Sequence, residues 1–447
     1  MEDIINWGGG GTLKVQLYCS MDSLTLDENS DVPVSVDRRN RTVKARTFGS
    51  MDIKPDFRIN IAFTDFPMLQ LICSGTGWLP DYKQGGFIMS GKLKVGIIGC
   101  GGIGSQKHLP AISGIKEAEV TAFCDIIPER AEKCCKEFGV DGAKTYTDYK
   151  ELLKDGSIDV VHICTPNSSH SPITVDSLEA GKHVMCEKPM ATSFDEAKKM
   201  VDAAKRTGKL LTIGYQYRCM PSPLYLKKLC ERGDLGEIYF AKAHAIRRRA
   251  VPTWGVFLKE KEQGGGPLID IGTHALDMTL WMMDNYKPKS VVGSVYKKLG
   301  GKPDCGNIFG PWDPKEYTVE DSAFGFITME NGATIILESS WALNTLDVGE
   351  GICTLCGTKA GADMKDGLRI NYDDLGKLTE IKPDLSVRGV QFYSGTSMEP
   401  KDIECRNWYN AILHGEELRV KPEQALVVTQ ILEGIYESAR IGRQVNF

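Results

Sequence analysis

The chain has 447 residues, of which 42% are hydrophobic and 25% charged, and its formal net charge is −5 at pH 7. A chain of this length suits two or three domains of a globular protein. The slightly acidic balance gives no reason to expect nucleic acid as a partner, and no apolar run reaches the roughly 18 residues of a membrane span.

The chain contains 14 cysteines. Several of them, such as Cys164 and Cys186, lie in apolar strand-like runs, where a thiol behaves as a small core residue. The pair Cys353 and Cys356 lacks the second ligand pair of a structural zinc site, so we expect no bound metal. The acidic N-terminus MEDIINWGGGG lacks the features of a signal peptide. These observations predict reduced thiols and a cytoplasmic location.

Residues 1–88 differ from the rest of the chain. They contain glycine runs and scattered charges, with weak strand-like runs at 12–18 and 58–63. Met89 is followed by SGKLKVGIIGCGGIG, which is typical of the start of a nucleotide-binding domain. We interpret residues 1–88 as an N-terminal extension of unknown role, and a genuine extra module is the alternative.

Residues 89–216 alternate short apolar runs with helical stretches. The predicted strands are 93–98, 119–124, 158–163, 182–186 and 209–214, and the predicted helices are 104–113, 128–138, 168–180 and 193–206. This alternation predicts an α/β fold with a doubly wound parallel sheet, the Rossmann arrangement.

Residues 217–447 have a different pattern, in which longer strands follow one another. The predicted strands are 237–247, 289–297, 317–329, 333–340 and 350–357, and the predicted helices are 221–232, 265–283, 401–414 and 421–440. The segment ENGA at 330–333 suits a hairpin turn. The pattern predicts an α+β domain with a large, mostly antiparallel open sheet.

A glycine-rich GxGxxG turn follows the first strand of the Rossmann pattern and opens a helix. Gly99 permits a tight turn, Gly101 a close approach of the backbone to a pyrophosphate, and Gly104 close packing of helix and strand. The N–H groups at the start of the helix favour phosphates. The expected cofactor-binding residues of the turn are Gly99, Gly101, Gly102, Ile103 and Gly104.

Asp125 ends the next predicted strand, 21 residues after Gly104. Its carboxylate can accept hydrogen bonds from both hydroxyls of an adenine ribose and would repel a 2′-phosphate. Ile126 and Ile127 follow, so no arginine stands there to receive such a phosphate. We therefore predict NAD rather than NADP. The alternative is that Asp125 caps the helix beginning at Pro128.

Polar residues follow two further strands at the edge of the sheet where ligands bind. They are Thr165, Pro166, Asn167 and His170 in TPNSSH, and Glu187 and Lys188 in EKP. Further along, GGGPLIDIGTHALD places Asp270 and His274 four residues apart, on one face of a helix. A satisfied polar pair on a buried helix is the alternative for Asp270 and His274, and a solvated loop residue for Lys188.

In order and spacing, GxGxxG, TPNxxH, EKP and GGGxxxDxGxH resemble the glucose–fructose oxidoreductase / inositol dehydrogenase family (Gfo/Idh/MocA). The resemblance covers residues 92–447 and includes GTKAG at 357–361. It implies a Rossmann domain at 89–216 and a C-terminal α/β domain at 217–447, whose open sheet mediates homo-oligomers. Family members oxidise or reduce a secondary alcohol of a sugar, cyclitol or related polyol with NAD(P).

The resemblance also implies roles for the motif residues. Lys188, Asp270 and His274 are the expected catalytic residues, and Glu187 is expected to contact the nicotinamide ribose. The other expected cofactor contacts are Thr165, Pro166, Asn167, His170 and, besides its catalytic role, Lys188. His274 would take the hydroxyl proton as hydride leaves for NAD, because an imidazole titrates near working pH. Lys188 would stabilise the developing alkoxide, and Asp270 would orient the imidazole or bind a neighbouring hydroxyl.

The glycine-rich entry GGG would let the helix of Asp270 start close to a neighbouring group, such as the nicotinamide of the cofactor. On the substrate side, GYQYRC departs from the family pattern, in which asparagine or phenylalanine precedes an arginine. The substrate candidates are therefore Gln216 and Arg218. Trp254 and Phe257 are candidates for an apolar wall over a sugar face or the nicotinamide, with surface-loop aromatics as the alternative.

The leading hypothesis is an NAD-dependent dehydrogenase acting on a sugar, glycoside or cyclitol. Some members of the family that this chain resembles oxidise the C3 hydroxyl of glucosides, and the length from Met89 and the segment RRRAVPTWGVF favour that activity. A ketone at C3 acidifies the hydrogen at C2, so a partner lyase would then expel the aglycone. The alternatives are a glycosidase that oxidises, eliminates and re-reduces with the same NAD, and a non-catalytic NAD-binding regulator.

Overall fold

A computed structural model describes residues 91–302, 306–385 and 399–447, together with four short strands nearer the N-terminus. The chain forms two compact units, Met1–Gly85 and Gly86–Phe447. In the first unit, a four-stranded sheet has the order β1-β2-β3-β4. Its strands are β1 (Ile4–Ile5), β2 (Val34–Asp37), β3 (Thr42–Ala45) and β4 (Gln70–Cys73). The predicted strands 12–18 and 58–63 lie outside the described residues.

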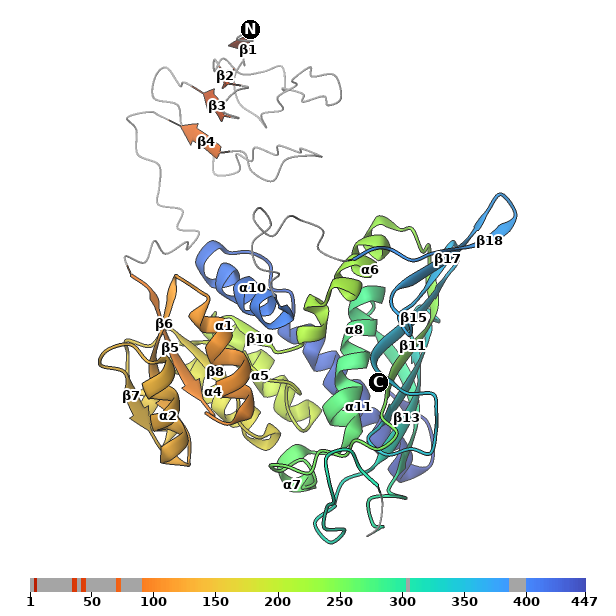
Figure 1. The fold of residues 1–447 in the computed structure, drawn as a ribbon. Coiled ribbons are helices and arrows are strands. Elements are labelled where there is room, and N and C mark those ends of the chain that lie inside the picture. Colours follow the sequence, from red (N-terminus) through yellow and green to blue (C-terminus); the bar gives the residue numbers. More distant parts are fainter. Residues whose placement is uncertain are drawn as a thin grey trace. The chain divides into compact units, whose positions relative to one another are not determined.

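The second unit begins with a six-stranded parallel sheet in the order β10-β9-β8-β5-β6-β7 (Figure 1). Its strands are β5 (Leu93–Ile98), β6 (Ala118–Cys124), β7 (Lys144–Tyr146), β8 (Val160–Ile163), β9 (His183–Cys186) and β10 (Leu211–Ile213). The central strands are apolar because helices cover both faces of the sheet. This order, with β5 and β8 side by side, creates the crevice in which doubly wound sheets bind ligands.

The helices of this part agree with the predicted alternation. They are α1 (Leu109–Ser113), α2 (Pro128–Phe138), α3 (Tyr149–Leu153), α4 (His170–Glu179) and α5 (Phe194–Thr207). The predicted helix 104–113 differs at its start, because it begins as a π-helical turn, η1 (Gly104–His108). The short elements β7 and α3 were not predicted.

A nine-stranded sheet in the order β18-β17-β16-β15-β11-β14-β13-β12-β19 follows. Its strands are β11 (Ile238–Ile246), β12 (Pro288–Tyr296), β13 (Ser322–Met329), β14 (Thr334–Ser340), β15 (Gly349–Gly357), β16 (Ala360–Asp363), β17 (Arg369–Asp374), β18 (Lys377–Ile381) and β19 (Val445–Asn446). Only β11 and β14 pair in parallel among these strands. The predicted fold class, a Rossmann sheet followed by a mostly antiparallel one, is confirmed.

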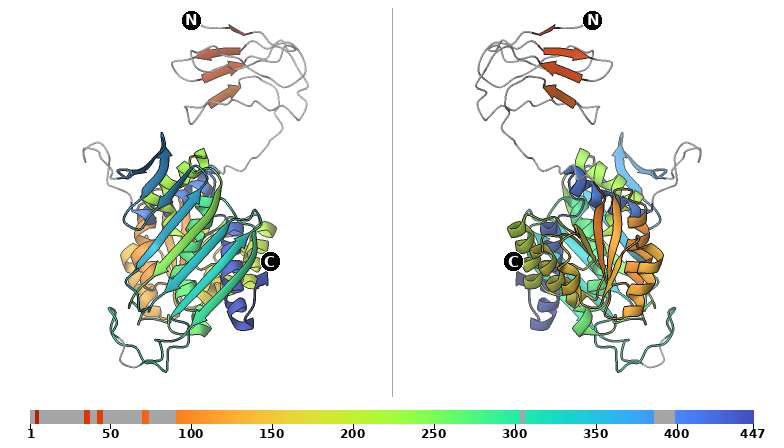
Figure 2. Two further views of the ribbon diagram at one scale, coloured as in Figure 1. Left: turned by 90° about the vertical axis from the view of Figure 1, so that its right-hand side faces the viewer. Right: turned by 90° about the vertical axis from the view of Figure 1, so that its left-hand side faces the viewer.

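Helices cover one face of the large sheet, and its other face is left uncovered by the described residues (Figure 2). These helices include α6 (Pro221–Arg232), α8 (Thr273–Met283) and α11 (Pro422–Ile441), with the short α7 (Glu260–Gln263) at one end. α8 packs between the sheet and α6, and its residues from Thr273 to Met282 are all buried. A largely apolar helix is expected in such a position.

The helix α10 (Pro400–His414) crosses back to the Rossmann part of the unit. It packs against α1, and its side chains Cys405, Trp408 and Tyr409 are buried in the same core as β5 and β6. The first core therefore includes residues from beyond the predicted boundary at residue 217, because a helix late in the sequence completes it.

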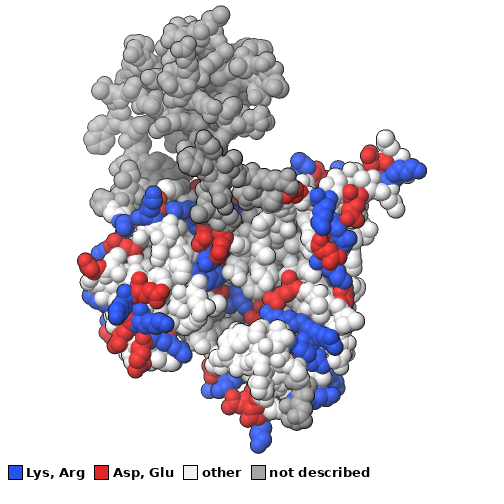
Figure 3. Space-filling model, in the orientation of Figure 1, with Lys and Arg blue, Asp and Glu red and all other residues white. Residues whose placement is uncertain are grey.

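The surface of the second unit carries charges of both signs. On the face seen in Figure 3, Lys and Arg residues are interspersed with Asp and Glu residues across the described part of the chain. No helix among the described residues combines the length and the hydropathy that crossing a lipid bilayer requires.

Candidate active site

The glycine-rich turn after β5 combines two crowded glycines with two open ones. Gly99 has a φ of +97°, and a Cβ there would lie 2.5 Å from the carbonyl oxygen of Cys164. A Cβ on Gly104 would lie 2.2 Å from the oxygen of Gly99. A Cβ on Gly101 or Gly102 would meet no atom within 4 Å. The turn is thus fixed by close packing on one side and open on the other, where a pyrophosphate could approach it.

Asp125 holds this turn against the loop that follows β6. Its Oδ2 accepts a hydrogen bond from the Cys100 N–H at 2.9 Å, and its Oδ1 accepts one from the Ile127 N–H at 2.9 Å. A carboxylate has further lone pairs, so it can still accept from ribose hydroxyls. Ile103 and Ile126 beside it are 51% and 88% exposed. Exposed apolar side chains around an open glycine turn fit the adenosine part of a dinucleotide.

The TPN segment after β8 connects the two parts of the unit. The Asn167 side chain donates to the carbonyl of Gln263 at 2.9 Å, and the Thr165 hydroxyl is buried with no hydrogen-bond partner in the protein. Pro166 is exposed at the turn. The unpartnered hydroxyl of Thr165 and the exposed Pro166 are compatible with the predicted cofactor contacts, which stay predictions.

His170 is fully buried. Its Nδ1 lies 2.7 Å from the carbonyl oxygen of Pro189, and its Nε2 lies 2.9 Å from that of Thr165. Because both ring nitrogens are directed at backbone carbonyls, His170 holds the TPN and EKP segments together. The structure gives it this positioning role, and the predicted contact with the cofactor stays a prediction.

Glu187 turns its carboxylate into a buried cluster. Its Oε1 lies 2.6 Å from the Lys107 Nζ and 2.7 Å from the His108 Nε2, and its Oε2 accepts from the Lys188 N–H at 3.1 Å. Lys107 also lies 3.0 Å from Glu404 on α10. Burial opposes ionisation, but Lys107 and His108 hold the pKa of Glu187 well below its usual value. The implied contact with a nicotinamide ribose stays a prediction.

Two imidazoles extend this cluster into a string of hydrogen bonds. The Nδ1 atoms of His108 and His162 lie 2.9 Å apart, and the His162 Nε2 lies 3.1 Å from the Tyr409 hydroxyl. Burial, helped by the charges of His108 and Lys107, lowers the pKa of His162 well below its usual value. We assign one direction to the string: Tyr409 donates to His162, His162 to His108, and His108 to Glu187. Sequence patterns did not reveal this string, because its members lie in unrelated segments.

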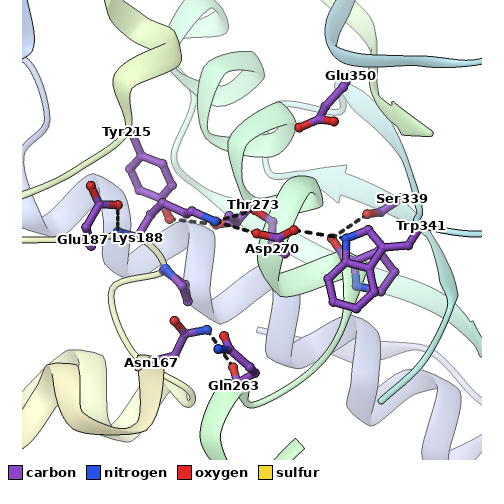
Figure 4. A network of polar contacts seen from close by, with 12 residues as sticks. Asn167, Glu187, Lys188, Tyr215, Gln263, Asp270, Thr273, Ser339, Trp341 and Glu350 are labelled. Atoms are coloured by element: carbon purple, nitrogen blue, oxygen red, sulfur yellow. Dashed lines mark hydrogen bonds and ion pairs between the residues drawn. The ribbon is translucent and has the colours of Figure 1, made fainter. Parts of the chain in front are cut away.

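Lys188 and Asp270 meet across the crevice (Figure 4). The Lys188 Nζ donates to the Asp270 Oδ1 at 2.8 Å and to its backbone oxygen at 2.9 Å. The Asp270 Oδ2 accepts from the Trp341 Nε1 at 3.1 Å. Burial acts against ionisation of Asp270, but Lys188 lowers its pKa below the usual value. An ammonium has three donors, so Lys188 retains one for an oxygen in the crevice.

His274 lies in the first turn of α8 and is 6% exposed. Its ring stacks on Tyr217 at a centroid distance of 4.4 Å and meets the edge of Tyr215 at 6.1 Å. Its Nδ1 is buried and has no hydrogen-bond partner in the protein. Burial, followed by the charge of Lys188, lowers the pKa of His274 to about 3. The imidazole is therefore neutral at neutral pH, and its pKa lies below the near-neutral value expected from the sequence.

The expectation that Asp270 orients the His274 ring was wrong in its geometry. Asp270 lies in a π-helical turn, η4 (Leu268–Gly272), that precedes α8. A π turn bonds residue i to i+5 and interrupts the 3.6-residue period on which the shared face depended. The carboxylate of Asp270 accordingly bonds Lys188 and Trp341. The charge of Asp270 still acts on the imidazole and favours its protonated form.

The glycine entry to this turn also differs from expectation. A Cβ added to Gly264 would lie 2.8 Å from the Thr192 side chain, and one added to Gly265 would lie 2.0 Å from the Tyr436 hydroxyl. A Cβ added to Gly266 would lie 2.3 Å from the backbone oxygen of Glu320. The close neighbours of the glycines are therefore protein groups and not the nicotinamide. The Glu320 carboxylate accepts from the Gly266 N–H at 2.7 Å and the Leu268 N–H at 3.1 Å, which satisfies the start of the helix.

The three predicted substrate residues have different positions. Arg218 is 0% exposed and its guanidinium binds both carboxylate oxygens of Asp277, at 2.6 and 2.9 Å, so the structure contradicts a substrate role. Gln216 is half-buried in the short helix η3 (Gln216–Cys219). Trp254 is 51% exposed and lies edge-to-face with Phe309 at 4.9 Å. The roles of Gln216 and Trp254 stay predictions.

Sequence reasoning missed Tyr217, which lies between Gln216 and Arg218 in GYQYRC and packs on the catalytic candidate His274. The departure of this segment from the family pattern was the available indication. Within the described ranges, no group of three or more His, Cys, Asp or Glu side chains is placed to bind a metal ion.

Three family models match the chain. "Oxidoreductase family, NAD-binding Rossmann fold" matches residues 93–215, and "GFO/IDH/MocA C-terminal domain" matches residues 224–363. "D-lyxose isomerase" matches residues 1–63, in the N-terminal unit. The match at 93–215 confirms the predicted NAD-binding domain and cofactor.

Curated relatives and solved structures agree with these matches. D-glucoside 3-dehydrogenase of Escherichia coli (strain K12) is 35% identical over 80% of this chain and 98% of its own length. Glucose-6-phosphate 3-dehydrogenase of Bacillus subtilis (strain 168) is 36% identical over 43% of this chain and 54% of its own. The structure of aldose-aldose oxidoreductase from Caulobacter crescentus superposes with a TM-score of 0.65 at 24% identity, covering 80% of this chain and 100% of that one.

These matches span both domains of the second unit, and the glycine turn, Asp125 and the Lys188–Asp270–His274 arrangement fit the same assignment. The chain belongs to the Gfo/Idh/MocA family of NAD-binding oxidoreductases.

Proposed function

We propose that the protein is an NAD-dependent dehydrogenase that oxidises a secondary alcohol of a sugar, glycoside or cyclitol. The observation that carries the proposal is the ion pair between Lys188 and Asp270 at the carboxyl edge of the Rossmann sheet, whose two charges both act on His274. The ion pair between Lys188 and Asp270 joins the two domains at 2.8 Å, and the unpartnered Nδ1 of His274 is buried nearby. A regulator that only bound NAD would gain nothing from this set of proton-transfer groups.

Each of the three residues has a distinct part in the reaction. The neutral His274 takes the proton of the substrate hydroxyl. The remaining N–H of Lys188 donates to the same oxygen and stabilises its developing negative charge. Asp270 fixes Lys188 and favours the protonated form of His274 by its charge. Bound NAD supplies the hydride acceptor. Gly101, Gly102 and Asp125 would hold its pyrophosphate and ribose, and Thr165 and Asn167 would line it.

We further propose the C3 hydroxyl of a glucoside as the site of oxidation. The support is the relative named D-glucoside 3-dehydrogenase, of which the chain spans 98% at 35% identity. Oxidation at C3 makes the hydrogen at C2 acidic, so a lyase that eliminates the aglycone is the reaction class that would consume the product.

The test is a panel of methyl glucoside, free aldoses and inositols with NAD, followed as absorbance at 340 nm. We expect NADH to accumulate with the glucoside. Lys188→Ala and His274→Ala should each lower kcat by ~10²–10⁴-fold and leave the Kd for NAD within a few-fold. Lys205→Ala, which changes a lysine that is 61% exposed, is the matched control.

Failure of every polyol in the panel would contradict the proposal. Release of aglycone without net NADH would instead favour a glycosidase that uses NAD catalytically. Normal turnover in both alanine variants would remove the three residues from the mechanism.

The finer organisation of the protein is also part of the proposal. Residues 1–88, 89–216 and 217–447 are proposed as an extension, a Rossmann domain and a substrate and oligomerisation domain. The uncovered face of the large sheet supports a homo-oligomer, because strands of that sheet carry large apolar side chains that are exposed: Tyr239, Val292, Tyr296 and Phe326. The eleven cysteines of the described residues have free thiols, which supports a reducing compartment such as the cytoplasm.

A further inference from the structure

A second polar group lies beside His274 that the reaction as described does not use. The Tyr217 hydroxyl donates to the Glu350 Oε1 at 3.1 Å. The Glu350 Oε2 accepts from the Arg247 Nε at 2.6 Å. Tyr217 in turn stacks on the His274 imidazole at 4.4 Å. We call Tyr217, Arg247 and Glu350 the tyrosine clamp. Its contacts run from His274, the proposed proton acceptor, through Tyr217 and Glu350 to Arg247.

The local backbone is built to hold the tyrosine clamp in place. Arg247 follows the last residue of β11, and Glu350 lies at the start of β15, where the pairing of these strands shifts register between His244 and Ile246. Such irregularities re-aim side chains and are frequent near active sites. Gly351 has a φ of +66°, and a Cβ there would lie 2.4 Å from the ring of Tyr217. The missing side chain at Gly351 makes room for the tyrosine.

The tyrosine clamp remains partly open to solvent. The side chains of Arg247 and Glu350 are 22% and 28% exposed. Figure 4 shows Glu350 reaching from the sheet toward the helix segment that carries Asp270 and Thr273. A carboxylate accepts further hydrogen bonds, and a guanidinium has five donors, of which the hydrogen bonds from Arg247 to Glu350 and to the Ala250 carbonyl use two. Acceptors and donors are therefore available side by side, as adjacent sugar hydroxyls require.

The charges around the proposed reaction centre cancel in pairs. Burial acts against ionisation of Asp270, but the cations Lys188 and Arg247 lower its pKa below the usual value. Lys188 is paired with Asp270, and Arg247 is paired with Glu350. His274 is neutral, because burial lowers its pKa to about 3. A phosphate or carboxylate on the substrate would find both of these cations already paired with carboxylates and would lie beside the like charges of those carboxylates.

We propose that the tyrosine clamp selects an uncharged polyol and rejects a phosphorylated or carboxylated sugar at the same site. This inference rests on the proposed dehydrogenase function and names its substrate class. Glu350 accepts hydrogen bonds from substrate hydroxyls, Arg247 donates to them, and Tyr217 fixes Glu350 and covers His274. Anions are rejected because Lys188 and Arg247 are already paired and because Glu350 carries a like charge, and repulsion of this kind is a common source of specificity. The relative named Glucose-6-phosphate 3-dehydrogenase supplies the contrasting substrate for a test.

The experiment compares kcat/KM for methyl glucoside, glucose 6-phosphate and methyl glucuronide. We expect the unchanged protein to prefer the neutral glucoside by at least ~10²-fold, because bringing like charges together at a binding site lowers affinity by orders of magnitude. Glu350→Gln, which keeps the shape and removes the charge, should reduce this preference by at least ~10-fold, mainly through a rise in kcat/KM for the anions. Asp347→Asn is the matched control, because it removes a carboxylate paired with Lys365 outside the tyrosine clamp. The Kd for NAD should be unchanged in both variants, which verifies folding.

The outcomes separate this inference from the function on which it rests. Equal kcat/KM for neutral and anionic sugars, or a preference for the anions, would overturn the inference and leave a working dehydrogenase. An unchanged preference in Glu350→Gln, or an equal change in Asp347→Asn, would overturn the assignment to Glu350. No turnover with any of the neutral or anionic sugars would overturn the proposed function together with the inference.

Discussion

His274 shows how burial decides the chemistry of a single residue. The imidazole is 6% exposed, and burial lowers its pKa to about 3 from an ordinary 6.5. In the unfolded chain the same group binds a proton below pH 6.5. The folded protein therefore binds fewer protons than the unfolded one between these two values, and the contribution of His274 to stability is lost as the pH falls through this window.

This difference predicts a pH-dependent effect of His274→Gln. Between pH 6 and pH 4 the free energy of unfolding of the unchanged protein should fall more steeply than that of the variant, by up to about 1.4 kcal/mol per pH unit. Urea unfolding of both proteins across this range measures the difference. Parallel pH dependences would show that the imidazole titrates normally in the fold.

The roles of single residues were predictable only where a motif fixes a backbone position. Lys188 and Asp270 follow strand-end and helix-start motifs, and they meet as a salt bridge. Arg218 belongs to an equally polar segment, but its burial against Asp277 depends on how α8 packs, which residue types do not reveal. Tyr217 was overlooked for the same reason, since a stacking partner is visible only once two segments have been placed together.

At the scale of elements, the glycine run 264–266 is a close-packing device. The three positions approach Thr192, Tyr436 and Glu320, and the Glu320 carboxylate satisfies N–H groups at the start of η4. Glu320 is almost wholly buried, and the hydrogen bonds that it accepts offset part of the cost of that burial.

Gly266→Ala should therefore destabilise the fold. The added Cβ would lie 2.3 Å from the backbone oxygen of Glu320, so the backbone must shift, at a cost of about 1–3 kcal/mol. Chemical denaturation measures this loss, and kcat should fall with it because Asp270 lies in the same turn. Gly301→Ala is the control, since a Cβ there meets no atom within 4 Å. Equal stability of the two variants would contradict the packing argument.

Elements with strong periodicity were predicted closely, and short ones were missed. The predicted helix 128–138 coincides with α2, because an apolar face and a proline at its start define it. The strands β16, β17 and β18 were missed because strands near the edge of a sheet are short and half exposed, which weakens their alternation. The π turns η1 and η4 were not foreseen, since residue spacing alone assumes a regular helix.

At the scale of the whole molecule, the N-terminal unit and the dehydrogenase unit are separable by several observations. The chain divides into compact units at Gly85 and Gly86. The match to the relative named D-glucoside 3-dehydrogenase covers 98% of that protein but only 80% of this chain. A different family model matches residues 1–63.

A chain that starts at Met89 should therefore retain the dehydrogenase activity. We expect its kcat/KM to stay within about 3-fold of the full chain, and its Tm to shift by only a few degrees, as for a change remote from the core. Steady-state kinetics and thermal unfolding of the two purified chains check both values. A loss of NAD binding on truncation would show that the N-terminal unit belongs to the catalytic fold.

The order of motifs predicted the order of domains, since each motif follows a strand or opens a helix of known type. The return of α10 to the first domain was not predictable from order, because nothing in its sequence names the sheet on which it packs. Its apolar side chains Cys405 and Trp408 suit either core equally well.

That return path means that the Rossmann half of the unit is not autonomous. A chain cut after residue 216 would expose to solvent the apolar side chains on which Cys405, Trp408 and Tyr409 pack. The cut would also leave His162 without the phenol that donates to it. We therefore expect the core of the first domain to be completed only once the last third of the polypeptide has been made.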